Sequence, residues 1–456
     1  MKKVAVLNVV GLTPALLPHA PFLSSWAHQG RMAAIKPTLP AVTCSVQSTF
    51  VTGVQPALHG IVGNGWYFRD EAEIKFWRQS NHLVQAQKIW EVARSANPDF
   101  TCANMFWWYN MYSSVDFSVT PRPMYPSDGR KLPDVYSHPS SLRFELQEEL
   151  GRFPLFEFWG PNSSIRSSQW IARASMRVSG RSDPTLTLIY LPHLDYVLQR
   201  EGPRGPSVSA EVAAIDAVCE ELVSFFEGRG TEVIVLSEYG ITDVRRGISL
   251  NRLLREHGYI AVREELGREL LDAGASRAFA VADHQIAHIY VNDTAALDDV
   301  RALIEGADGV DFVAGERGRK ALGLDHSRAG DLIAVADEDA WFTYYYWMDD
   351  ERAPDFARTV DIHRKPGYDP VELFLDPQLR APKLRVGLRL IQKTLGFRYL
   401  MDVIPLDASL VKGSHGRFPH TSSDGPLIIS RSADLVPGDE IHATGIQEVI
   451  LKHLGL

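Results

Sequence analysis

A threonine and an asparagine, twenty-one residues apart, are the side chains whose types and spacing point most directly to chemistry. Thr43 opens the stretch 43–52, which is predicted as a short helix ended by Gly53, and Asn64 follows in a glycine-rich turn. A helix N-terminus offers free amide N–H groups and a partial positive charge, so an anion bound there would contact the Thr43 hydroxyl. Phosphate or sulfate suits this position. Each residue alone is equally typical of a helix cap or an Asn-Gly turn, and only the joint spacing favours chemistry.

The sequence that joins these two residues resembles a known family. Residues 52–64, in which Thr-Gly is followed by the pattern xxPxxHGIVGN, are similar to the alkaline phosphatase superfamily, most closely to its type I phosphodiesterase/nucleotide pyrophosphatase branch. The resemblance implies that Thr43 attacks phosphorus as the nucleophile and that Asn64 steadies the phosphoryl oxygens. The implied activity is that of a phosphoric ester hydrolase, a phosphodiesterase or nucleotide pyrophosphatase, with a small phosphate ester as substrate.

The resemblance also implies a site for two divalent metal ions, which would activate the threonine and balance the phosphoryl charge. The chain keeps two of the family's ligand positions, as Asp195 and His415. Four further ligand positions are altered, and they hold Val10, Gln199, Glu238 and Tyr239. An amide or a phenol is a weaker ligand than an imidazole, and the apolar Val10 (or Asn8, two residues earlier) removes a bridging charge.

A smaller metal site is the alternative to the full pair. We expect Asp195, His415 and His363, with Glu238 nearby, to form a site that suits zinc, with manganese or iron as the other choices. Whether one ion or two would bind stays open. The chain offers further polar candidates for such a site, namely His193, Asp283, His284 and His288. Each candidate histidine, His363 included, is also typical of a hydrogen-bonded packing or surface residue.

Composition limits the function classes. The chain of 456 residues has 45% hydrophobic and 23% charged residues, which is typical of a globular protein. Its net charge of −9 argues against a nucleic-acid-binding surface, which needs clustered Lys and Arg. Three cysteines are too few for a disulfide framework and favour a reducing, cytoplasmic location. The opening apolar run is interpreted as a buried first strand, and no segment is long and apolar enough to predict a membrane span.

Apolar runs alternate with amphipathic helices along the chain, which predicts an α/β fold with a mostly parallel sheet and helices on both faces. The resemblance makes this fold alkaline-phosphatase-like, with a core formed by residues 1–65, 185–340 and 412–456. Predicted strands include residues 4–10, 185–191, 232–236, 278–282, 287–291, 332–336 and 427–429. Asp195 and Glu238 each follow a strand closely, where active residues of such sheets gather, so we expect Thr43 and Asp195 to converge on one pocket.

Two segments differ in composition from this core. Residues 66–184 and 341–411 are rich in aromatic residues and loops, and we expect them to be cap insertions that wall the pocket. The second contains a basic helical stretch, residues 383–398. Any single aromatic is typical of core packing, but together they indicate a partly apolar substrate or a protein partner.

Two functions are consistent with these features of the sequence. The first is a metal-dependent phosphoric ester hydrolase with a Thr nucleophile, and the second is a catalytically degenerate relative that binds a phosphate ligand or acts as a scaffold. A sulfatase is disfavoured because Cys44 is followed by Ser45, Val46 and Gln47, rather than by the family's Cys-x-Pro-Ser-Arg context. A phosphomutase would need the intact metal set.

Overall fold

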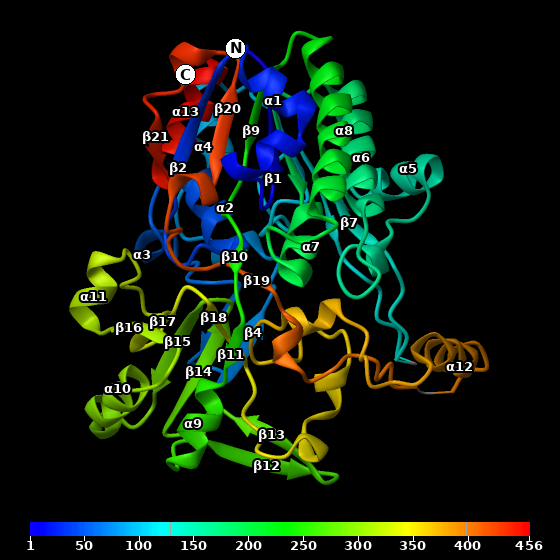
Figure 1. The fold of residues 1–456 in the computed structure, drawn as a ribbon. Coiled ribbons are helices and arrows are strands. Elements are labelled where there is room, and N and C mark those ends of the chain that lie inside the picture. Colours follow the sequence, from blue (N-terminus) through cyan, green and yellow to red (C-terminus); the bar gives the residue numbers. More distant parts are fainter. Residues whose placement is uncertain (128, 398) are drawn as a thin grey trace.

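The computed structural model describes residues 1–127, 129–397 and 399–456. A nine-stranded, mostly parallel sheet forms the centre of its upper half (Figure 1). In spatial order the strands are β21 (Glu440–His442), β2 (Arg31–Lys36), β20 (Leu427–Ser430), β9 (Glu232–Leu236), β1 (Val4–Val9), β8 (Leu186–Leu191), β5 (Cys102–Met105), β6 (Phe117–Pro121) and β7 (Val135–His138). The central strand β1 pairs in parallel with β8 and β9. The predicted α/β class is confirmed.

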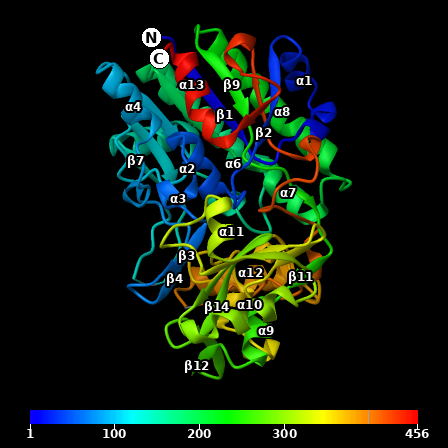
Figure 2. The ribbon, with the colours of Figure 1, turned by 90° about the vertical axis from the view of Figure 1, so that its left-hand side faces the viewer.

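Helices cover both faces of this sheet (Figure 2). Every residue of β1 and β8 is buried, so neither face can be left to solvent. One face carries α1 (Pro21–Ala27), α6 (Ile165–Ser182) and α8 (Val208–Glu227), and the other carries α2 (Thr43–Thr52), α4 (Ile89–Ala96) and α13 (Ile446–Leu454). The stretch 13–30 is divided into the 3-10 helix η1 (Pro14–His19) and α1, because Pro21 has no N–H to continue the ladder.

A second, four-stranded sheet lies in the lower half of Figure 1. Its order is β14 (Ala278–Asp283), β15 (Ile286–Val291), β17 (Leu332–Ala336) and β16 (Val310–Ala314), and all its pairs are antiparallel. Three of these strands were predicted as strands of the alternating α/β core, but they form this separate sheet. Only two residues join β14 to β15, and a connection that short allows only an antiparallel pair.

The segment 66–184 is not wholly a cap. Its strands β5, β6 and β7 extend the central sheet beyond β8, and β5 pairs with β8 in parallel. The expected cap segment therefore also contributes strands to the central sheet. Strands of four or five residues inside an aromatic-rich stretch give too short a hydrophobic pattern to be recognised in the sequence.

The remaining elements are short. They include the strand pairs β3 (Gly65–Phe68) with β4 (Glu73–Phe76), β10 (Thr242–Asp243) with β19 (Gly413–Ser414), β11 (Arg246–Ile248) with β18 (Ala340–Phe342), and β12 (Ala261–Glu265) with β13 (Arg268–Asp272). The other helices are α3 (Pro56–His59), α5 (Ser141–Leu150), α7 (His193–Glu201), α9 (Leu250–Glu256), α10 (Leu297–Glu305), α11 (Glu316–Ala321) and α12 (Pro382–Thr394). Within the described residues, none of the helices has the length and apolarity required to cross a bilayer.

Candidate active site

Helix α2 positions the Thr43 hydroxyl. The helix spans the predicted residues, and Gly53 ends it in the left-handed region with φ 68°. Val42, in extended conformation, is the N-cap residue, so Thr43 is the first helical residue rather than the cap. Its hydroxyl lies 3.0 Å from the hydroxyl of Tyr239.

Asn64 lies against the start of the same helix. The Cys44 backbone N–H donates to Asn64 Oδ1 at 3.0 Å. The backbone N–H and the side-chain amide of Asn64 both donate to the carboxyl of Asp283, at 2.7 and 3.0 Å. Asp283 ends β14 of the second sheet, so that sheet orients Asn64 across a sequence separation of 219 residues. The side-chain amide of Asn64, which would bind the oxygens of an anion, thus already donates to Asp283.

Tyr239, which follows β9, joins Thr43 to Asp195. Its hydroxyl donates to Asp195 Oδ1 at 3.1 Å, and its ring is stacked on His415 with ring centroids 3.6 Å apart. Asp195 lies in the first turn of α7, directly after β8. Thr43 and Asp195 therefore converge on one site, as expected, but through the oxygen of a phenol.

The Asp195 carboxyl has two more neighbours. Gln199, one turn later on α7, donates from Nε2 to Asp195 Oδ2 at 2.7 Å. His415 Nε2 lies 3.8 Å from Asp195 Oδ1, while His415 Nδ1 donates to the Ala41 carbonyl at 2.7 Å. Burial raises the pKa of Asp195 to about 7, against the effect of its hydrogen bonds from Tyr239 and Gln199. Burial also lowers the pKa of His415 to about 3, so this imidazole is neutral.

Glu238 is bound by two side-chain amides. Asn8 of β1 and Gln47 of α2 each donate to Glu238 Oε1 at 2.5 Å. Burial raises the pKa of Glu238 to about 8, although both amides favour its ionised form. Gln47 also accepts from the Trp108 backbone N–H at 2.7 Å, which connects the site to the first aromatic segment.

These donors do not fit the metal pair that the resemblance implies. The Tyr239 oxygen lies between Thr43 and Asp195, where an ion shared by the two would have to bind. Gln199 presents an N–H, not a lone pair, to Asp195, and the hydrogen bonds of Glu238 are to amides. Among the described residues, no group of three or more His, Cys, Asp or Glu side chains could hold a metal ion.

The four expected ligands are accordingly not gathered into one ion site. Asp195 and His415 are neighbours, but Glu238 is engaged by Asn8 and Gln47. The hydrogen bond recorded for His363 joins its Nδ1 to the Phe76 carbonyl at 3.4 Å. No hydrogen bond or ion pair among the described residues joins His363 to Asp195, Glu238 or His415.

Aromatic side chains from both predicted insertions lie over the site. The Tyr368 hydroxyl donates to Gln199 Oε1 at 2.9 Å, and its ring is stacked on His284. Trp77 and Trp159 pack around Tyr368 with ring centroids 6.0 and 5.7 Å away. Sequence reasoning did not single out Tyr368, because its role depends on a contact with α7 across 169 residues.

A cavity of about 260 Å³ is lined in part by Tyr239 and His415. Its lining also includes four carboxylates, those of Asp243, Glu338, Asp339 and Asp424, together with Arg417 and His420. Arg204 pairs with Asp243, and Arg245 and Arg246 pair with Asp339, so neighbouring cations offset part of this negative charge.

Comparisons with known proteins agree with this architecture. The family model described as type I phosphodiesterase / nucleotide pyrophosphatase matches residues 4–369. An uncharacterized pyrophosphatase/phosphodiesterase of Schizosaccharomyces pombe is 24% identical over 254 residues, which are 54% of this chain and only 43% of that relative.

Solved structures share the fold. An inactive Thr-to-Ala variant of murine ectonucleotide pyrophosphatase/phosphodiesterase 5, in complex with AMP, aligns over 100% of this chain and 96% of its own with 15% identity and a TM-score of 0.59. Phosphonoacetate hydrolase from Sinorhizobium meliloti 1021, in complex with phosphonoformate, aligns over 99% and 96% with 13% identity and a TM-score of 0.60. The matched family model covers most of the chain, and the chain therefore belongs to the type I phosphodiesterase / nucleotide pyrophosphatase family.

Proposed function

We propose that this chain is a catalytically degenerate member of its family, which acts as a scaffold and does not transfer phosphoryl groups. The observation that carries this proposal is the Tyr239 hydroxyl, which lies within hydrogen-bond distance of both Thr43 and Asp195. The position beside the Thr43 hydroxyl, where an ion shared with Asp195 would bind, thereby holds a neutral phenol, which supplies no positive charge to a phosphoryl oxygen.

The electrostatics of the site support the same proposal. Phosphoryl transfer needs cationic groups or metal ions around the phosphoryl oxygens. Here the titratable groups are the carboxyls of Asp195, Glu238 and Asp283, and two histidines whose pKa values burial lowers, His284 and His415. A phosphate ester would meet neutral imidazoles and carboxyls, and each carboxyl that ionised would repel it.

A metal-free hydrolase is the second candidate, because one observation favours it. Thr43, Tyr239 and Asp195 form a continuous hydrogen-bond chain that ends on a carboxyl. Thr43 Oγ1 would attack phosphorus while its proton passed to Tyr239 and the Tyr239 proton passed to Asp195. The P–O bond to the leaving group would break, and solvent would protonate that group. Water would then hydrolyse the phosphothreonine as the proton returned from Asp195 to Thr43. The metal-dependent form of this reaction does not fit the donor set.

Turnover of bis(p-nitrophenyl) phosphate separates the candidates. The wild type, Thr43→Ala and Tyr239→Phe are each assayed as purified, with added zinc or manganese, and with a chelator. A scaffold predicts a wild-type rate equal to that of Thr43→Ala in every condition. The second candidate predicts a chelator-resistant rate that both variants lose. Turnover that requires a metal and is lost in Asp195→Ala would overturn both in favour of the metal-dependent hydrolase.

A cytoplasmic location is part of the proposal. All three cysteines, Cys44, Cys102 and Cys219, are buried free thiols. Free thiols without disulfides are typical of proteins from a reducing compartment.

A further inference from the structure

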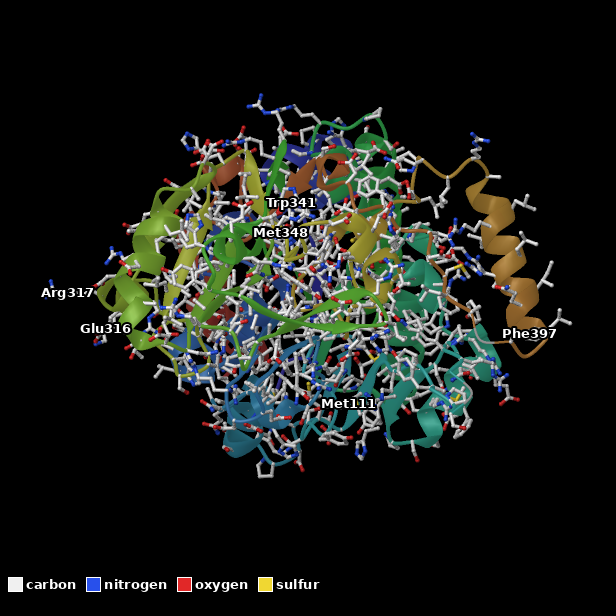
Figure 3. The ribbon with its side chains drawn as sticks, turned by 90° about the horizontal axis from the view of Figure 1, so that it is seen from below. Met111, Glu316, Arg317, Trp341, Met348 and Phe397 are labelled. Carbon is white, nitrogen blue, oxygen red and sulfur yellow. The ribbon has the colours of Figure 1, made fainter. Side chains whose placement is uncertain are left out.

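Helix α12 (Pro382–Thr394) lies outside the body of the protein. In Figure 1 it projects at the right-hand edge, and the view from below in Figure 3 also places it at the margin, with Phe397 near its end. The helix belongs to the second aromatic segment, and its sequence is the basic stretch noted above.

One side of this helix is apolar and exposed. Leu384, Leu388 and Leu395 are spaced four and seven residues apart. In a helical conformation this spacing places all three side chains on the same face. Their exposed fractions are 64%, 55% and 68%. Phe397, just beyond them, is 66% exposed. A surface helix normally turns such a face towards the protein.

The opposite side of α12 holds the helix to the protein. Val386 packs against an apolar cluster that includes Trp341 and Val403. Arg385 and Arg389 both bind the carboxylate of Asp402. The orientation is thus the reverse of that of an ordinary surface helix, because ion pairs fix the inner side and leucines form the outer side.

The charge of this segment differs from that of the whole chain. Residues 380–398 contain six Lys or Arg residues and no Asp or Glu, whereas the chain carries a net charge of −9. This segment combines positive charge with exposed leucines, on a protein that is acidic overall. It is therefore complementary to a surface that carries negative charges above an apolar layer.

We propose that α12 is an interfacial helix that docks this protein on the surface of an anionic lipid bilayer. The three leucines and Phe397 enter the boundary between head groups and acyl chains, and the positive charge that the segment 380–398 keeps beyond its pairing with Asp402 attracts the anionic head groups. The area also favours lipid over a protein partner. Four such side chains expose on the order of 400 Å², below the roughly 600 Å² that each partner of a stable protein–protein interface buries.

Vesicle flotation of the full-length protein tests this proposal. The vesicles are either pure phosphatidylcholine or an equimolar mixture of phosphatidylcholine and phosphatidylglycerol. We expect the wild type to float with the mixed vesicles, to bind pure phosphatidylcholine about tenfold more weakly, and to be released by salt. The double variant Leu388→Glu with Leu395→Glu should lose at least about tenfold in binding, because it places charges on the inserted face.

A matched control comes from a leucine elsewhere. Leu58 on α3 is 65% exposed, and Leu58→Glu should bind vesicles as the wild type does. A wild type that fails to bind the mixed vesicles would overturn the proposal, as would equal binding by the double variant. Sedimentation equilibrium adds a further check. A wild-type dimer that the double variant converts to a monomer would show that a second copy covers the leucines, and the bilayer would be the wrong partner.

Discussion

The Thr43 site and helix α12 differ in what their side chains contact. At the site, polar groups from α2, α7, β1 and the β9 loop are buried and bind one another, as in the chain from Thr43 through Tyr239 to Asp195. On α12, leucines are exposed to solvent, and the described residues of the protein offer them little cover. In the first region most polar groups pair within the protein, although Asn8 Oδ1, Glu238 Oε2 and His415 Nε2 have no hydrogen-bond partner among the described residues. In the second region the apolar side chains are directed outwards.

This difference indicates where a partner can gain binding energy. A ligand at Thr43 must break hydrogen bonds that the protein already makes, and each broken bond to a buried group costs free energy. A bilayer at α12 only removes exposed apolar surface from water. The chain belongs to a phosphodiesterase family, but the surface that we propose for recognition lies on α12, outside the Thr43 site.

The largest effect is expected at Asp283. Asp283→Ala leaves the backbone N–H and side-chain amide of Asn64 without their acceptor in a buried site, and should lower the free energy of unfolding by about 3 kcal/mol. Chemical denaturation measures this. Asp283→Asn keeps one acceptor oxygen and should lose less. Equal stability of the wild type and Asp283→Ala would show that the site is not held closed by these bonds.

The pH dependence of stability should be the next largest effect. The pKa of Glu238 is raised to about 8 in the folded protein from an ordinary value of 4.5, so the folded state holds this proton more tightly than the unfolded state. Stability relative to Glu238→Gln must then fall as pH rises from about 4.5 to about 8, by about 2 kcal/mol or more overall. Denaturation of both proteins across this range measures it, and the subtraction cancels other titrating groups. A difference that does not change with pH contradicts a raised pKa.

Loss of the Tyr239 hydroxyl should have a smaller effect. Tyr239→Phe removes the hydrogen bonds to Thr43 and Asp195, and should cost about 1.5 kcal/mol in the free energy of unfolding. Tyr344→Phe is the matched control, because the buried Tyr344 hydroxyl has no hydrogen-bond partner among the described residues. Its removal should cost nothing. Similar losses for both variants would mean that the Thr43–Tyr239–Asp195 chain adds no stability.

The smallest effect is expected on α12. Leu388→Glu with Leu395→Glu should change the free energy of unfolding by no more than about 0.5 kcal/mol, because exposed leucines contribute little to folding. Denaturation of the double variant beside Leu58→Glu measures this. A loss several times larger would show that these leucines are part of the core.

The sequence predicts well the helix and strands that carry the site residues. The stretch 43–52 is a helix ended by Gly53, and Asp195 and Glu238 follow strands β8 and β9 as expected. These features depend on short patterns, namely hydrophobic runs and a glycine with positive φ, which act over a few residues.

The partners of these residues could not be predicted in the same way. Asp283 was a candidate metal ligand in the sequence, but in the fold it orients Asn64 from another sheet. Tyr368 and Gln47 were not singled out, because each reaches the site from a distant segment. The orientation of α12 could not be predicted either, because it depends on Asp402. This residue lies beyond the helix and forms ion pairs with Arg385 and Arg389 on the inner side.

Metal content tests the central claim most directly, namely that the Tyr239 phenol has replaced ion binding beside Thr43. The wild type and a double variant, Gln199→His with Tyr239→His, are dialysed against zinc and then against metal-free buffer, and elemental mass spectrometry gives the metal per chain. We predict no stoichiometric metal in the wild type. Zinc should be retained by the variant, in which two imidazoles are added beside Asp195 and His415. One or more equivalents in the wild type, lost in Asp195→Ala, would contradict the claim.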